Sequence, residues 1–398
     1  MGLREPDSRR ESVLTEMPVC AERSARVASP RLRRARRRGP TESRVWSVAS
    51  SILRVCQIGK NLCHFSAIGS TVGAEVVEMT DELKDRYDVV VIGGGAAGLS
   101  AGLMLARARR TVAVIDAGEP RNAPAKAVHG LFAREGTPPS ELLERGRAEV
   151  RQFGGHVVAG TVTAAKRGED GFTVALADGR EARARRVLVT TGVVDRLPEI
   201  PGLREQWGEG VVHCPYCHGW EIRDRAIGIV ATGPFSVHQA LLFRQWSEDV
   251  VFFLGEQDRP GEEDLEKFAA RGIRVVEGPI AKVETADGRI VGVRLADGEL
   301  VEREALAVAT RVEARAGFIG DLGLAAVEHP SGMGEHVPAD PFGRTEVPGV
   351  WVAGNVTDLS MQVGNVAAAG AMAGAQINME LVEEDTEAAV RVRRQAAS

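Results

Sequence analysis

The chain has 398 residues, of which 44% are hydrophobic and 26% charged, so it is long enough for two ordinary domains. This composition excludes a collagen-like, a wholly disordered and a polytopic membrane protein. The net charge of −5 conceals two different segments, because residues 1–78 carry 14 Lys and Arg against 8 Asp and Glu, whereas residues 79–398 carry 36 against 47.

The basic first segment contains six arginines among the eight residues 31–38. Such a run can bind nucleic acid or form part of a transit peptide, but it is also typical of a solvated tail. Met79 leads directly into a strand-forming stretch and resembles a natural start. We therefore interpret residues 1–78 as a disordered or non-native extension.

The segment from Tyr87 to Asp116 predicts a dinucleotide-binding unit. The apolar run 87–92 lacks alternation, which is typical of a buried parallel strand. A glycine-rich loop, 93–98, follows it, and we expect a helix over 99–110 and a second strand over 111–115. The strand, loop, helix and strand in this order make the glycine pattern specific.

Each glycine of this loop has a physical role. Gly93 permits the tight turn, Gly95 lets a pyrophosphate approach the backbone, and Gly98 lets the helix pack on the strand. The helix N-terminus presents free N–H groups to a phosphate, and Asp116 is placed to accept hydrogen bonds from ribose. The predicted cofactor-binding residues of this unit are Gly93, Gly95, Ala96, Ala97, Gly98 and Asp116.

The stretch His213-Cys214-Pro-Tyr-Cys217-His218 predicts a redox dithiol. Two cysteines three residues apart at a helix start can form and reopen a disulfide, and His218 can lower a thiol pKa and transfer protons. Other interpretations are a haem-attachment CxxCH signature, a zinc site formed with both histidines, and plain buried cysteines. We expect no metal here, because two adjacent His-Cys pairs form a tetrahedron poorly.

Together with two later segments, this motif resembles the two-dinucleotide-domain flavoproteins, specifically the thioredoxin-reductase-like branch. One segment is the strand that closes on Thr190-Thr191-Gly192, and the other is Val347–Asn355 followed by a small-residue helix expected over 367–377. The resemblance implies FAD as the cofactor. The residues that it adds to the predicted FAD site are Asn122, Thr191, Gly192, Gly354, Asn355, Gln362 and Val363.

The resemblance also implies roles for the redox motif. Cys217 would face the flavin, and Cys214 would exchange with substrate. His218 replaces the Asp that usually follows the second cysteine, and CPYCHGWE is similar to the branch of the gliotoxin and holomycin dithiol oxidases. His129, in a loop after Asn122, either lines the flavin or substrate face or is packed within its loop.

The middle of the chain repeats the first unit at an offset of 119 residues, with Asp-Gly turns at 178–179 and 297–298. By resemblance this second fold would bind NADPH. In its loop 231–236, however, Ala231 and Ser236 replace two glycines. Acidic Glu256 and Asp258 stand where the family places basic residues for the 2′-phosphate. We therefore leave NADP(H) binding open, with loss of tight binding favoured over drift in a working site.

The predicted fold class is α/β, with two Rossmann-like dinucleotide-binding domains, the central one inserted into the FAD domain. The predicted ranges are the FAD-binding domain at 79–197 and 321–385, the central region at 198–320, and a tail at 386–398. The predicted function is FAD-dependent dithiol–disulfide oxidoreduction through Cys214, Cys217 and His218, favouring oxidation of a small dithiol by O₂. The alternatives are an NADPH-dependent thioredoxin reductase and a non-catalytic flavin-binding regulator.

The expected partner is a small dithiol or disulfide, or a thioredoxin-like protein, with no nucleic acid and no membrane. Only Cys214 and Cys217 occur in the last 320 residues, which fits a reducing, cytoplasmic compartment better than a disulfide framework. The family resemblance implies a homodimer.

Overall fold

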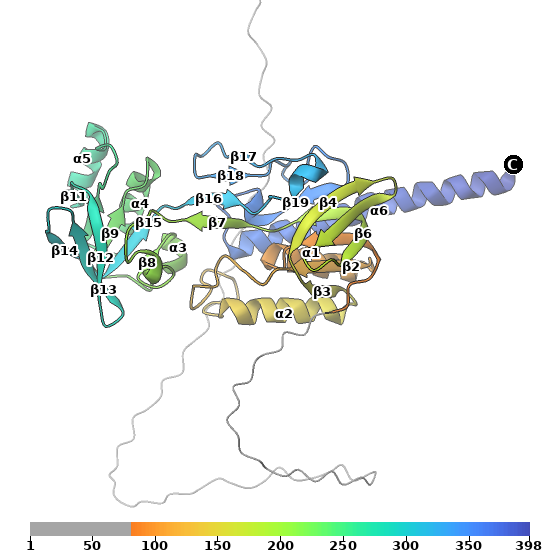
Figure 1. Ribbon diagram of the computed structural model, residues 1–398, viewed down its shortest axis with the longest axis horizontal. Helices are drawn as coiled ribbons and strands as arrows, with labels where there is room; N and C mark the ends of the chain where they lie inside the picture. Colours follow the sequence, from red (N-terminus) through yellow and green to blue (C-terminus); the bar gives the residue numbers. More distant parts are fainter. Residues whose placement is uncertain (1–80) are drawn as a thin grey trace, which may run out of the picture. The chain divides into compact units, whose positions relative to one another are not determined.

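The computed structural model describes residues 81–398 (Figure 1). They belong to one compact unit, Glu75–Ser398. The extension expected over residues 1–78 lies outside the described residues.

The first apolar strand is the centre of a seven-stranded sheet. β1 (Arg86–Ile92) pairs in parallel with β2 (Val112–Asp116) and with β6 (Glu181–Val189). The strand order is β3-β2-β1-β6-β5-β4, and β19 pairs in parallel with the end of β6. The other strands are β3 (His156–Ala159), β4 (Val162–Gly168), β5 (Gly171–Leu176) and β19 (Val350–Val352). Val89, Val90 and Val91 are fully buried, as the unbroken apolar run predicts for a strand covered on both faces.

Three helices accompany this sheet, and the described residues also contain three short 3₁₀ turns, of which η1 lies in the central region. α1 (Ala96–Arg107) packs against α2 (Pro139–Gln152) and α6 (Val363–Ala397). The 3₁₀ turns are η1 (Arg204–Gln206), η2 (Ile319–Leu322) and η3 (Gly354–Val356).

The central region has a second parallel sheet with the order β11-β10-β9-β15-β8. Its strands are β8 (Val211–Val212), β9 (Ile227–Val230), β10 (Val250–Phe253), β11 (Arg274–Val276) and β15 (Ala305–Val308), and its helices are α3 (Pro215–His218), α4 (Phe235–Phe243) and α5 (Glu262–Ala270). A three-stranded antiparallel sheet adjoins it, made of β12 (Ile280–Ala286), β13 (Arg289–Leu295) and β14 (Leu300–Glu302). The order β11-β10-β9-β15 matches β3-β2-β1-β6 of the first sheet, which confirms two Rossmann-like folds.

Two antiparallel strands connect the two folds (Figure 1). The chain leaves the first fold through β7 (Val193–Arg196) and returns through β16 (Arg311–Ala314). The central fold is therefore inserted into the first one, as expected. After β16 the chain forms the small β17–β18 pair (Val327–Glu328 and Glu335–His336) before β19.

The two Asp-Gly turns of the internal repeat are present. Gly179 and Gly298 have φ of +89° and +96°, and each lies between antiparallel strands. The second copy differs in one respect, because its last strand is divided into β14 and β15. Arg303 lies at this break, almost buried, with its guanidinium 2.6 Å from Asp249.

Two helices differ in extent from the sequence expectation. The helix expected over 99–110 begins at Ala96 and ends at Arg107, because the chain turns at Arg109 with φ of +64°. The helix expected over 367–377 runs from Val363 to Ala397, and so includes residues 386–397 of the segment 386–398 that we named a tail. No Gly or Pro interrupts it after Gly374, and Arg391 pairs with Glu387 one turn before it.

Within residues 81–398, no helix is long and apolar enough to cross a membrane.

Close backbone approach fixes the start of α1. A Cβ added at Gly98 would lie 1.8 Å from the carbonyl oxygen of Gly93, and one added at Gly370 of α6 would lie 2.0 Å from that of Ala97. These glycines therefore let α1 touch the β1 loop on one side and α6 on the other. Alanine or any larger residue would force the elements apart.

We expect Gly98→Ala to destabilise the protein, although alanine in a helix is otherwise favoured over glycine by about 1 kcal/mol. The clash with Gly93 should cost about 1–3 kcal/mol or more, as overpacking does. Urea unfolding would measure it. Gly364→Ala is the matched control, since its Cβ would meet only Leu131 Cδ1 at 3.5 Å. Equal stability of the two variants would contradict this account.

Candidate active site

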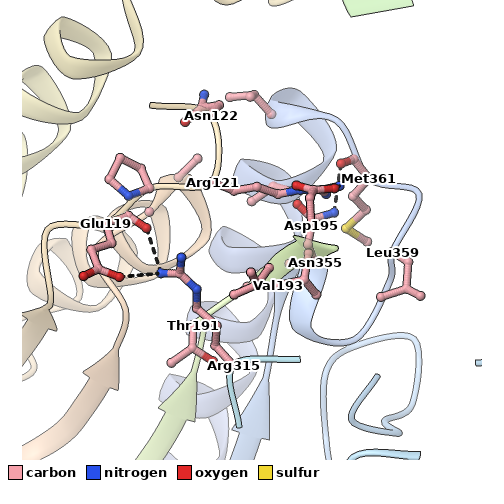
Figure 2. Close-up of a pocket in the computed structure, with 18 of the residues that line it drawn as sticks. Glu119, Arg121, Asn122, Thr191, Val193, Asp195, Arg315, Asn355, Leu359 and Met361 are labelled. Atoms are coloured by element: carbon pink, nitrogen blue, oxygen red, sulfur yellow. Dashed lines mark hydrogen bonds and ion pairs between the residues drawn. The ribbon is translucent and has the colours of Figure 1, made fainter. Parts of the chain in front are cut away.

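A cavity of about 1,090 Å³ joins the predicted site residues. Its wall includes the glycine-rich loop, the end of β6, the first turn of α6 and the redox motif. Figure 2 shows part of this wall, including Asn122, Thr191 and Asn355, which point toward the same region from three separate segments.

Among the glycines of the glycine-rich loop, only one has open space where a Cβ atom would be. Gly93 has φ of +112°, and a Cβ there would lie 2.5 Å from the Thr190 carbonyl oxygen. At Gly95, the N-cap of α1, an added Cβ would meet nothing within 4 Å. No side chain caps this helix, so its first-turn N–H groups, including those of Ala96 and Ala97, are available to a phosphate.

Asp116 is held against the loop at the end of β2. Its Oδ1 accepts hydrogen bonds from the backbone N–H of Gly94 at 3.2 Å and of Gly118 at 3.3 Å, and its Oδ2 lies 3.1 Å from Arg147. Carboxylate oxygens have further acceptor capacity, so this position still suits a ribose hydroxyl.

The end of β6 presents an unsatisfied hydroxyl to the cavity. Thr190 Oγ1 donates to the Gly93 carbonyl at 2.8 Å and so ties this strand to the loop. Thr191 Oγ1 is buried and has no hydrogen-bond partner among residues 81–398, and Gly192 beside it has φ of +69° with open space at its Cβ. A buried hydroxyl of this kind requires a partner, which a bound ligand would supply.

The segment after β19 closes the cavity from the other side. Gly354 has φ of +82°, and a Cβ there would lie 3.1 Å from the Ala97 Cβ. Asn355 Nδ2 donates to the carbonyls of Asp358 at 3.1 Å and Met361 at 3.0 Å. The amide therefore braces its own loop, and only its Oδ1 is left for the predicted hydrogen bond to a cofactor.

These residues fit an extended dinucleotide such as FAD. The open Cβ position at Gly95, the uncapped α1 terminus and the unpartnered Thr191 hydroxyl all border one cavity. Gln362 and Val363, at the start of α6, border it as well. Every predicted cofactor-binding residue except Gly98, which packs against Gly93, lines the cavity.

The two cysteines form a close pair at the start of α3. Cys214 is the N-cap of this short helix, with Pro215 in its first turn. The Cys217 thiol donates to Cys214 Sγ at 2.6 Å. Gln362 Nε2 lies 3.9 Å from Cys214 Sγ, so the redox motif meets the first turn of α6. Cys214, rather than Cys217, makes this contact, and the division of roles between them stays a prediction.

The cysteines differ strongly in acidity. The hydrogen bond from Cys217 lowers the pKa of Cys214 to about 7, against the opposing effect of burial, with help from the N–H groups of Cys217 and Tyr216. The same hydrogen bond and burial raise the pKa of Cys217. Cys214 is therefore the cysteine of the reduced pair that ionises first as the pH rises.

His218 is held neutral by its surroundings. Both ring nitrogens are buried without a hydrogen-bond partner among residues 81–398. Burial lowers the pKa of His218, and the charges of His129 and His213 add to this effect, whereas Glu221 opposes it. A neutral imidazole beside the cysteines has a free lone pair and can accept a proton.

An ion pair beside the redox motif was missed by sequence reasoning. Arg121 Nε and Nη2 each lie 2.7 Å from an Asp195 carboxylate oxygen (Figure 2). The Thr310 hydroxyl donates to Asp195 at 2.6 Å. Burial would raise the pKa of Asp195, but these partners outweigh it and lower that pKa. Only the Pro120-Arg-Asn122 motif could have signalled Arg121, and nothing local distinguishes Asp195.

His213 packs behind the cysteines. Its Nδ1 lies 3.1 Å from the Val308 carbonyl oxygen and 3.4 Å from the Thr310 backbone nitrogen. Burial and the charge of Arg121 lower the pKa of His213. Within residues 81–398, no group of three or more His, Cys, Asp and Glu side chains could hold a metal ion.

The second nucleotide loop, 231–236, is closed by its own groups. Thr232 N–H donates to Ser236 Oγ at 3.0 Å, and Ser236 N–H donates to the Gly233 carbonyl at 3.0 Å. Pro234 has no N–H, and Ser236 is fully buried. Two of the loop's amides are therefore used within the loop, and a third is missing at Pro234.

This chain is similar to known proteins of one family. The family described as pyridine nucleotide-disulphide oxidoreductase matches residues 87–373. Thioredoxin reductase tcpT of Claviceps purpurea is 32% identical over 308 residues, covering 75% of this chain and 95% of that protein. The crystal structure of HlmI is 43% identical with a TM-score of 0.74, covering 78% and 97% of the two chains. An oxidoreductase from Agrobacterium tumefaciens is 36% identical with a TM-score of 0.70, covering 75% and 99%.

We expect Gly95→Val to give mostly cofactor-free protein with an unchanged fold. The valine side chain meets no protein atom near its Cβ, but it occupies the space through which a pyrophosphate reaches the backbone. The ratio of flavin to protein absorbance measures the first effect, and urea unfolding of the stripped protein measures the second. Cofactor content equal to that of Gly364→Ala would contradict this assignment.

Alkylation of the reduced protein by iodoacetamide should modify Cys214, with a rate that rises through pH 7 and levels above it. The thiolate is the reactive species, and the pKa of Cys214 is lowered to about 7. In Cys217→Ala the hydrogen-bond donor is lost, so the midpoint should move up toward an ordinary thiol value. Mass spectrometry identifies the modified cysteine. Preferential alkylation of Cys217 at pH 7 would show the opposite assignment.

Proposed function

Since this chain belongs to the pyridine nucleotide-disulphide oxidoreductase family, we propose that it oxidises a small dithiol through Cys214 and Cys217, with O₂ as the final acceptor. The family assignment makes the chain an FAD-binding oxidoreductase that acts on sulfur groups. The alternative of a non-catalytic flavin-binding regulator is therefore not pursued.

The chemistry of the cysteines follows from their acidity. In the oxidised enzyme the two cysteines form a disulfide, and a substrate thiolate attacks Cys214 Sγ, so that Cys217 leaves as a thiolate. The second substrate thiolate then attacks the substrate sulfur of this mixed disulfide. The substrate disulfide forms, and Cys214 leaves. The lowered pKa of Cys214 favours this last step, because a more acidic thiol leaves faster.

The balance is two electrons and two protons. Both electrons pass from the substrate sulfurs to the enzyme's cysteine pair, and the protons leave the two substrate thiols. FAD, when bound in this cavity, supplies a two-electron acceptor that delivers the electrons to O₂ as hydrogen peroxide. His218 is the proposed acceptor for a substrate proton, because its ring is neutral and lies in the same cavity.

We favour an oxidase over a reductase because of the internal hydrogen bonds of loop 231–236. A dinucleotide phosphate needs free amides, and Thr232 and Ser236 use theirs within the loop. Glu256 and Asp258, both exposed just after β10, would repel a 2′-phosphate. The proposed source of electrons is therefore the dithiol rather than NADPH.

The second candidate is a thioredoxin reductase working from NADPH. Relatives bearing that name favour it, among them tcpT at 32% identity and a protein of Aquifex aeolicus at 28%. In that case the partner would be thioredoxin or another disulfide. We propose further that the enzyme is a homodimer in a reducing, cytoplasmic compartment, as the family resemblance implies.

We expect dithiothreitol to reduce the flavin rapidly under anaerobic conditions, whereas NADPH should reduce it slowly or not at all. In air, the flavin should reoxidise with formation of hydrogen peroxide. Stopped-flow flavin absorbance and a peroxide assay measure both. Rapid, saturable reduction by micromolar NADPH would restore the reductase interpretation.

A charge reversal tests the same site. Glu256→Arg should improve reduction by NADPH more than by NADH, because only NADPH carries the 2′-phosphate. Glu248→Arg is the matched control, since it makes the same charge change just before β10, at the other end of that strand.

A further inference from the structure

One wall of the cavity is formed by α4 of the central fold. Four residues of this helix line it, and their spacing places them on one helix face: Phe235, His238, Gln239 and Leu242. None of the predicted FAD-binding residues lies on α4. The predicted cofactor site therefore does not account for this wall.

The lining face of α4 lies beside the redox motif. Gln239 Nε2 donates to the carbonyl of His213 at 2.8 Å, and His213 directly precedes Cys214. The rings of Tyr216, between the cysteines, and Trp246, just after α4, meet at 88° with centroids 5.8 Å apart. These contacts join α4 to both ends of the short segment that carries the cysteines.

The side chains of this wall are mostly apolar or aromatic, and two of their rings are exposed. Phe235 is 45% exposed and Tyr216 is 61% exposed, and both border the cavity. The rings of Phe235 and His238 have centroids 5.3 Å apart. Leu242 adds an aliphatic side chain one turn further along the helix. Exposed apolar surface within a cavity is typical of a binding site for an apolar group.

The second nucleotide loop places Phe235 in this wall. Phe235 is the first residue of α4 and follows Pro234. Ser236 beside it is fully buried, and its hydroxyl accepts the Thr232 N–H within the loop. An aromatic ring therefore borders the cavity at the loop where the sequence predicts a degraded phosphate site.

We propose that the lining face of α4, together with Tyr216, binds the carbon skeleton of the substrate and selects a small dithiol built on an apolar ring. This inference rests on the proposed dithiol oxidation. A substrate whose sulfur reaches Cys214 lies next to Tyr216 and the adjoining face of α4. None of the four lining residues of α4 is Asp, Glu, Lys or Arg, so this face favours an uncharged skeleton. Phe235 is the specificity-determining residue of this wall.

The test compares two dithiols with the full-length, FAD-loaded enzyme. Ortho-benzenedimethanethiol carries an aromatic ring, whereas dithiothreitol has a polar aliphatic chain. Phe235→Ala removes the aromatic ring from the wall, and Phe235→Leu keeps an apolar side chain there. Phe132→Ala is the matched control, because Phe132 is 96% exposed and does not line the cavity. The ratio of the two kcat/KM values, compared between variants, cancels the different intrinsic reactivity of the two dithiols.

We expect the unsubstituted enzyme to prefer the aromatic dithiol, and Phe235→Ala to lower this preference about 10-fold, mainly through KM. Loss of an apolar contact in a substrate pocket has an effect of this order. Phe235→Leu should keep most of the preference, and Phe132→Ala should keep all of it.

A second measurement separates binding from turnover. The S-methylated derivative of ortho-benzenedimethanethiol keeps the ring but has no thiol, so it cannot form a disulfide. It should slow the alkylation of Cys214 by iodoacetamide in the reduced unsubstituted protein and in Phe132→Ala. In Phe235→Ala the protection should be about 10-fold weaker.

The inference is overturned if Phe235→Ala and Phe132→Ala show the same preference, or if the S-methylated derivative does not protect Cys214 in the unsubstituted protein. Oxidation of reduced thioredoxin with a higher kcat/KM than the aromatic dithiol would overturn it as well, since the substrate would then be a protein. A failure of the proposed function looks different, because the enzyme would oxidise neither dithiol. Protection of Cys214 would still decide whether Phe235 binds the ring.

Discussion

Backbone contact at the start of α1 is the constraint from which the site follows. Gly98 lies against the Gly93 carbonyl and Gly370 against that of Ala97, so the helix touches both the β1 loop and α6 without side chains between them. Neighbouring Gly95 is then left facing open space. The same contacts set the position of the first turn of α6, where Gln362 meets Cys214.

The two Rossmann-like folds share a strand order but differ in their nucleotide loops. In the first, Gly95 leaves open space at the start of α1. In the second, the Ser236 hydroxyl occupies the Thr232 amide, and Pro234 removes another donor. A few side chains therefore decide whether the same architecture presents donors to a phosphate or uses them internally.

The electrostatics of the cavity favour the neutral form of His213 and His218 and make its first cysteine acidic. His213 and His218 are desolvated, so their pKa values are lowered. Burial alone would raise the pKa of Cys214, but the hydrogen bond from the Cys217 thiol at 2.6 Å outweighs this effect and lowers it. The positive charge of Arg121 also lowers the pKa of Cys214 and so favours its thiolate. Because Arg121 forms an ion pair with Asp195, this charge is not left unpaired.

The sequence by itself determined both Rossmann-like units, the glycine loop and the CxxC pair, because each depends on residues within about 30 positions of one another. It could not set the end of α6, which continues to Ala397 where a tail was expected. It also could not show that the Asn355 amide braces its own loop. Contacts such as His129 with Glu221, and Arg121 with Asp195, join residues 74 or more positions apart. Only the tertiary structure decides such pairs, because a charged side chain has no local preference for a distant partner.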